Sequence, residues 1–223
     1  MADDVEQWIE SVRADAVDGI SAPGDWLSGA QRLASWFESR SADSHPLDRA
    51  RRSALTPLAV DGAHQATEML SAAAVEVVHR VGSDPGRLTK RWAEEQIDEL
   101  GAEVYTELVG VASIVRALDT FSVAMGEPVV DLPPPVSGDP IRERPDDVGE
   151  VGAWVPQSVN KARANVSRAL SLVPRTNEIW RTVVDSHYSR GQQFMELAWS
   201  RALSRVQVEA VAARTTIALD CFY

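Results

Sequence analysis

The sequence predicts an all-α protein, and three observations support this class. Apolar residues recur at three- and four-residue steps along most of the chain, which is typical of amphipathic helices. Helix-ending signals separate these stretches, such as Ser83-Asp84-Pro85 and Gly126 followed by Pro128. No convincing strand alternation or Asn-Gly hairpin signal appears. We therefore expect a helical bundle.

The first half of the chain carries most of the predicted helices. The helical pattern covers residues 3–18, 26–38, 47–58 (interrupted at Pro57), 66–81, 85–100 and 102–125. Asp25 is expected to be the N-cap of the second of these helices. The last one is apolar on most of its surface, which indicates burial in the centre of a bundle or at a subunit contact.

The segment 127–150 differs from the rest because it is rich in proline. It contains Pro128, Pro133, Pro134, Pro135, Pro140 and Pro145. Proline at this density prevents regular helix and favours extended geometry. We interpret 127–150 as a connector between two helical halves, 1–126 and 151–223, of one domain.

The second half carries four further helical patterns. They cover residues 154–172, 175–188, 192–199 and a terminal segment from Leu203, for which Ser204 is the expected N-cap.

Composition limits the classes of function. A net charge of −11 argues against nucleic-acid binding, which needs a basic surface. The Arg49–Arg52 cluster is interpreted as a solvated face. One cysteine cannot form an internal disulfide and suits a reducing cytosol. The N-terminus is unlike a signal peptide, and no apolar run approaches the roughly 18 residues that span a bilayer. We expect a cytoplasmic protein that binds no membrane.

The four histidines show no metal-ligand spacing. His64 and His79 are far apart in helical phase, His45 is expected in a loop, and His187 has no neighbouring ligand candidate. The sequence also lacks a Gly-rich phosphate loop and a Gly-x-Ser-x-Gly elbow. We therefore predict neither a metal nor a cofactor.

Glu209 and Cys221 are the candidate catalytic pair. They are twelve residues apart, a separation of about 18 Å on one straight helix at roughly 1.5 Å per residue. They can cooperate only if the chain reverses between them. Thr215-Thr216 weakens helix propensity and Asp220 is a good N-cap, so we predict a reversal between Thr215 and Asp220. A buried Glu209 would then accept the thiol proton.

The interval from Glu209 to Cys221-Phe-Tyr resembles the motif of the alkylhydroperoxidase D-like superfamily, which includes the carboxymuconolactone decarboxylases. Segments 107–128, 168–174 and 203–214 also resemble that family. The resemblance implies a homo-oligomeric peroxidase with a hydroperoxide substrate and a dithiol electron donor. It also implies that Glu209 is the proton acceptor and Cys221 the resolving half of a cysteine pair.

The family's second cysteine and its histidine would follow Tyr223. A chain that stops at Tyr223 is therefore expected to be a poor peroxidase, either as part of a longer protein or as a relative without the family's chemistry. The alternative is a non-catalytic helical module for assembly or partner binding. That alternative predicts an exposed Glu209 and an unreactive Cys221.

Overall fold

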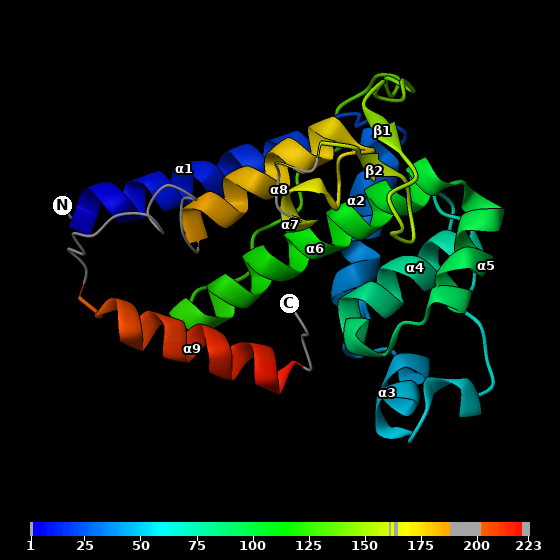
Figure 1. Cartoon of the computed structure of the whole chain (residues 1–223), viewed down its shortest axis with the longest axis horizontal. Helices are drawn as coiled ribbons and strands as arrows, with labels where there is room; N and C mark the ends of the chain where they lie inside the picture. The colour runs from blue at the N-terminus through cyan, green and yellow to red at the C-terminus, as the bar shows by residue number, and fades with distance from the viewer. Residues whose placement is uncertain (1, 161, 163–164, 188–201, 220–223) are drawn as a thin grey trace.

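Figure 1 shows the computed structural model, which describes residues 2–160, 162, 165–187 and 202–219. Most of these residues are helical, which confirms the all-α class. In this part of the chain, the β structure is one antiparallel pair of two-residue strands, Val148–Gly149 (β1) and Gln157–Ser158 (β2). The alkylhydroperoxidase-type arrangement of the helices stays a prediction.

The described helices, in chain order, are α1 (Ala2–Ser21), α2 (Gly29–Ser41), α3 (Pro46–Ser53), the 3-10 turn η1 (Pro57–Ala59), α4 (Ala72–Ser83), the 3-10 turn η2 (Pro85–Arg87), α5 (Lys90–Leu100), α6 (Ala102–Met125), α7 (Asn165–Arg168), α8 (Pro174–His187) and α9 (Arg205–Ala218).

Helix α6 is the centre of the bundle. It packs against α2, α4, α5 and α8, and twelve of its residues are buried. One hydrophobic cluster joins its first half to α4 and α5, and a second joins its later half to α1, α2 and α8. Gly126 ends the helix in the left-handed region, with φ of 74°, as predicted from the sequence. The expectation that no apolar run is long enough to span a bilayer is wrong, because α6 is apolar enough by length and composition alone, a test that the core helix of a soluble protein passes too. The predicted subunit contact through α6 stays a prediction.

The predicted cap of α2 is wrong. The helix begins at Gly29, where Ser28 and Gln31 form a capping box. Asp25 instead caps α8, because its carboxylate accepts hydrogen bonds from the backbone N–H groups of Arg175 at 3.1 Å and Thr176 at 3.2 Å. A partner 150 residues away in the sequence thus determines the role of Asp25.

Several predicted helix bounds are also wrong. Helix α3 ends at Ser53 rather than continuing to residue 58, and α4 starts at Ala72 rather than 66, capped by Ser71. The predicted helix 85–100 is divided into η2 and α5, with Thr89 as the cap of α5. Within 154–172 the described helix is only α7, because residues 157–158 pair with β1 instead. The predicted helix 192–199 lies outside the described residues.

The proline-rich segment runs along the turn between α1 and α2. Backbone N–H groups of Val136, Ile141 and Arg142 donate to the carbonyl oxygens of Ser21, Gly24 and Asp25 at 2.9, 3.3 and 2.7 Å. The chain that follows returns to the bundle, since α8 packs against both α1 and α6. The parts before and after this segment therefore share one core.

Glu107 binds the turn before α2 to the central helix α6. Its buried carboxylate accepts hydrogen bonds from the backbone N–H groups of Asp25, Trp26 and Leu27 at 3.2, 2.6 and 3.0 Å. Arg32 Nε lies 3.3 Å from the same carboxylate. A Cβ at Gly24 would lie 1.8 Å from Glu107 Oε1, so only glycine fits there. The turn thus depends on one buried acid.

We predict that Glu107→Ala lowers the free energy of unfolding by about 3–5 kcal/mol, because it leaves Arg32 as a buried cation without its partner. Glu103→Ala is the matched control on the same helix, since its partner Arg144 is exposed, and it should cost less than about 1 kcal/mol. Chemical denaturation measures both. Equal costs would contradict the structural role of Glu107.

Candidate metal centre

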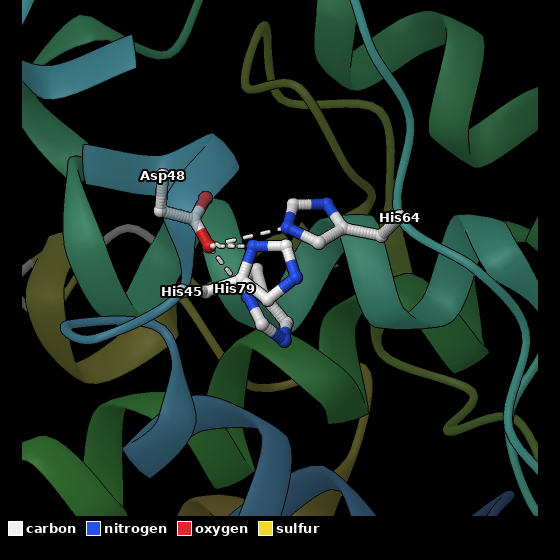
Figure 2. Close-up of side chains that lie close together, drawn as sticks. All are labelled: His45, Asp48, His64 and His79. Atoms are coloured by element: carbon white, nitrogen blue, oxygen red, sulfur yellow. Dashed lines mark hydrogen bonds and ion pairs between the residues drawn. The ribbon is translucent and has the colours of Figure 1, made fainter. Parts of the chain in front are cut away.

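Three imidazoles and one carboxylate converge at one end of the bundle. His45, Asp48, His64 and His79 each offer a ligand atom, and these four atoms all lie within 4.8 Å of one another. Figure 2 shows the three rings gathered about one oxygen of Asp48. Asp48 Oδ2 lies 2.6 Å from His79 Nδ1, 3.1 Å from His64 Nε2 and 3.6 Å from His45 Nδ1.

Three neighbouring stretches of chain bring these side chains together. His45 is the N-cap of α3, whose first residue is Pro46, a residue suited to the first helical position. Asp48 follows His45 by three residues, so both lie on one face of the helix start. His79 comes from α4, and His64 from the chain between η1 and α4. The centre therefore links α3 and this connecting chain to α4. Figure 1 shows α3 at the end of the molecule below α4.

Further carboxylates bind the outer sides of two rings. His64 Nδ1 lies 2.7 Å from Glu76 Oε2, and His79 Nε2 lies 2.9 Å from Glu38 Oε2. Arg51 donates to both oxygens of Glu76 at 2.9 Å. Metal-binding histidines almost always have a carboxylate, a carbonyl or water on the ring nitrogen that faces away from the metal. The predicted solvated role of Arg51 is wrong, because its side chain is buried in this network.

The hydrogen-bond pattern of these rings favours a positive charge beside Asp48. A neutral imidazole carries one N–H, and an ionised carboxylate only accepts hydrogen bonds. The rings of His64 and His79 each lie between two carboxylates, Asp48 on one side and Glu76 or Glu38 on the other. If each ring carries one N–H, its other nitrogen faces a carboxylate oxygen with no hydrogen between them. The lone pairs of the two atoms then repel each other. Protonation of the rings or a bound metal ion removes that repulsion.

The electrostatics of the centre favour positive charge. Burial opposes protonation of His64, but its hydrogen bonds to Asp48 and Glu76 outweigh burial and raise its pKa to about 9. Burial likewise opposes ionisation of Asp48, and the hydrogen bonds from both imidazoles still hold its pKa well below the usual range. Burial and the neighbouring rings lower the pKa of His45, which favours the neutral form that binds metals.

Two polar atoms at the centre have no hydrogen-bond partner. Asp48 Oδ1 and His45 Nδ1 are both buried and unpartnered. A buried polar atom without a partner costs free energy, so each such atom in a folded protein needs a reason. An ion bound by His45 Nδ1 and by both oxygens of Asp48 would supply a partner for both atoms.

The segment 43–69 has almost no hydrophobic core of its own. The large apolar residues Leu55 and Leu58 are exposed. Its buried residues are Asp48, Arg51, Pro57 and His64. Polar contacts at the centre, rather than apolar packing, therefore hold this segment against the rest of the bundle.

The sequence analysis expected the histidines to lie apart, and for three of them this is wrong. His64 and His79 do come from different elements, but their ring centroids lie 4.1 Å apart, and that of His45 lies 4.8 Å from His64. His45 with Asp48, and Glu76 with His79, have the same three-residue spacing. That spacing was the available local signal, since it places each pair on one helix face.

The predicted catalytic pair is described only in part. Glu209 lies on α9, where 49% of its side chain is exposed and its carboxylate lies 3.9 Å from Arg205 Nε. The reversal is predicted between Thr215 and Asp220. Helix α9 continues through Thr215 and Thr216 to Ala218, so the chain does not reverse in the first part of that range, and Asp220 lies outside the described residues. Cys221 lies outside the described residues. An exposed Glu209 is what the non-catalytic alternative predicts.

Comparison with known proteins does not identify the chain: no family model, no curated protein and no solved structure matches it. The resemblance to the alkylhydroperoxidase D-like superfamily stays a prediction.

We predict that Glu209→Ala changes the free energy of unfolding by less than about 0.5 kcal/mol, because an exposed ion pair contributes little. Thermal or chemical denaturation checks this. A loss comparable with that of Glu107→Ala would contradict the exposed position of Glu209.

Proposed function

We propose that this protein binds one divalent transition-metal ion through His45, Asp48, His64 and His79. The observation that carries the proposal is the convergence of four ligand atoms within 4.8 Å, with carboxylates on the outer nitrogens of His64 and His79. Neither feature alone is rare. Together they match the ligand set of a histidine-rich metal site and the outer contacts of two of its three rings.

The spacing of the ligand atoms supports four-coordinate binding. In a tetrahedral site with metal–ligand bonds of about 2.0 Å, neighbouring ligand atoms are about 3.3 Å apart. The three distances from Asp48 Oδ2 to the ring nitrogens, 2.6, 3.1 and 3.6 Å, lie on both sides of that value. The four atoms spread over as much as 4.8 Å, so the side chains would have to move closer together to seat an ion.

The donor set favours zinc. Three imidazole nitrogens and one carboxylate oxygen suit a borderline-soft ion without a strong geometric preference, and imidazole also binds copper, iron and nickel. The ion would replace protons on the buried rings as the positive charge beside Asp48. Because the segment 43–69 lacks a hydrophobic core, metal binding would hold α3 against α4.

We predict that wild-type protein retains one equivalent of Zn²⁺ after desalting, measured by elemental analysis. His79→Gln removes a buried ligand and should weaken Zn²⁺ binding by more than about 100-fold, beyond the usual effect of an outer-shell change. His187→Ala is the matched control, because this histidine lies on α8 and its ring contacts Phe121 instead. No bound metal in the wild-type protein, or equal losses in both variants, would contradict the proposal.

We predict that Glu76→Gln lowers the affinity for Zn²⁺ by about 10–100-fold, because a neutral amide polarises the His64 ring less than a carboxylate does. Glu94→Gln is the control, since Glu94 is exposed on α5 and pairs with Lys90. A competitive titration with a zinc chelator measures both affinities. An unchanged affinity in Glu76→Gln would remove the outer-shell part of the argument.

A second candidate function is the thiol peroxidase implied by the sequence resemblance. One observation favours it: α9 ends at Ala218, and Leu219 has non-helical angles of φ −102° and ψ 6°, so a change of direction just before Cys221 is feasible. The test is hydroperoxide consumption, with a dithiol reductant, by the product of the complete reading frame. Loss of activity in Cys221→Ser is expected, and unchanged activity would overturn this role.

A further inference from the structure

The four candidate ligands are not held equally firmly. The side chains of Asp48, His64 and His79 are at most 1% exposed, whereas 39% of the His45 side chain is exposed. His45 Nδ1 is also the ligand atom farthest from Asp48 Oδ2, at 3.6 Å. Three ligands are therefore enclosed by protein, and the fourth lies at the surface.

The outer contacts show the same asymmetry. Glu76 fixes the ring of His64, and Glu38 fixes that of His79. Among the described residues, no hydrogen-bond partner holds either nitrogen of His45. His45 is also the cap residue of α3 yet makes no side-chain capping bond. Its rotation away from the centre would break no hydrogen bond.

We infer that His45 is an exchangeable ligand, and that water or a small monodentate anion can take its place on the metal. This inference rests on the proposed metal site. The remaining set, two histidines and one aspartate, matches sites that keep an open coordination position, whereas closed sites use four protein ligands. In the exchange the metal–nitrogen bond to His45 breaks and a bond to the incoming donor atom forms.

An open position gives the centre more than a structural role. A divalent ion there lowers the pKa of a bound water or polarises an anion that enters from the solvent side. His45, released but still tethered at the start of α3, would then lie beside the incoming ligand. The incoming ligand must be a small molecule, because protein encloses the other three coordinating side chains.

The experiment uses Co²⁺, whose visible spectrum reports coordination, with sodium azide as the probe ligand. Wild type, His45→Ala and His64→Ala are loaded with Co²⁺ and titrated with azide. His45→Ala should retain one equivalent of Co²⁺ with affinity lowered by about 10–100-fold, the size of an outer-shell loss, and His64→Ala should lose more. Azide should change the spectrum of wild type, and at lower concentration that of His45→Ala.

Added imidazole should return the His45→Ala spectrum toward that of the wild type. Circular dichroism verifies the fold of each variant, and His45→Gln replaces His45→Ala if the latter does not fold. Spectra that azide leaves unchanged in both wild type and His45→Ala, or a loss of Co²⁺ in His45→Ala equal to that in His64→Ala, would overturn the exchange. Wild-type protein that binds no Co²⁺ and no Zn²⁺ would instead overturn the metal site itself.

Discussion

The buried carboxylate of Asp48 is the interaction on which one end of this molecule depends. An ionised carboxylate in a protein interior is costly unless it is paired and hydrogen-bonded. Asp48 is fully buried, and its partners are imidazoles from α4 and from the chain before it. Those rings are in turn held by Glu38 and Glu76. The result is a compact cluster of buried carboxylates and imidazoles.

The chain therefore combines two ways of stabilising structure. Around α6 the core is apolar, and the buried acid Glu107 ties the turn before α2 to it. Around Asp48 the contacts are polar. Helix α4 serves both, because Val77 and Val78 enter the core while Glu76 and His79 face the centre. Carboxylates hold both nitrogens of the His64 and His79 rings, so His45, whose side chain is 39% exposed, is the least constrained of the set.

The sequence was informative where structure is local. The apolar pattern predicted α6 and its burial, and Gly126 and Ser204 were correctly predicted as caps, because each depends on neighbours within a few residues. Asp25 was misplaced because its partners lie on α8. Arg51 was predicted to be solvated because the sequence does not reveal its contact with Glu76, which lies on another helix.

The centre could not be predicted for the same reason. Its ligands come from three stretches of chain, and no fixed spacing links His64 to the others. The helical spacing of His45 with Asp48, and of Glu76 with His79, indicates pairs but not that the pairs meet. For Glu209, an interval of twelve residues suggested a reversal that α9 does not make at Thr215-Thr216. For the residues of the centre, spacing along the chain was a weak guide to proximity.

X-ray absorption spectroscopy of the zinc-loaded protein tests the central claim most directly. We expect a first shell of nitrogen and oxygen atoms only, at about 2.0–2.1 Å, with the outer-shell scattering of imidazole rings. A first shell that contains sulfur, or a spectrum without imidazole scattering, would mean that the metal is bound elsewhere and that the cluster around Asp48 is only a buried ion network.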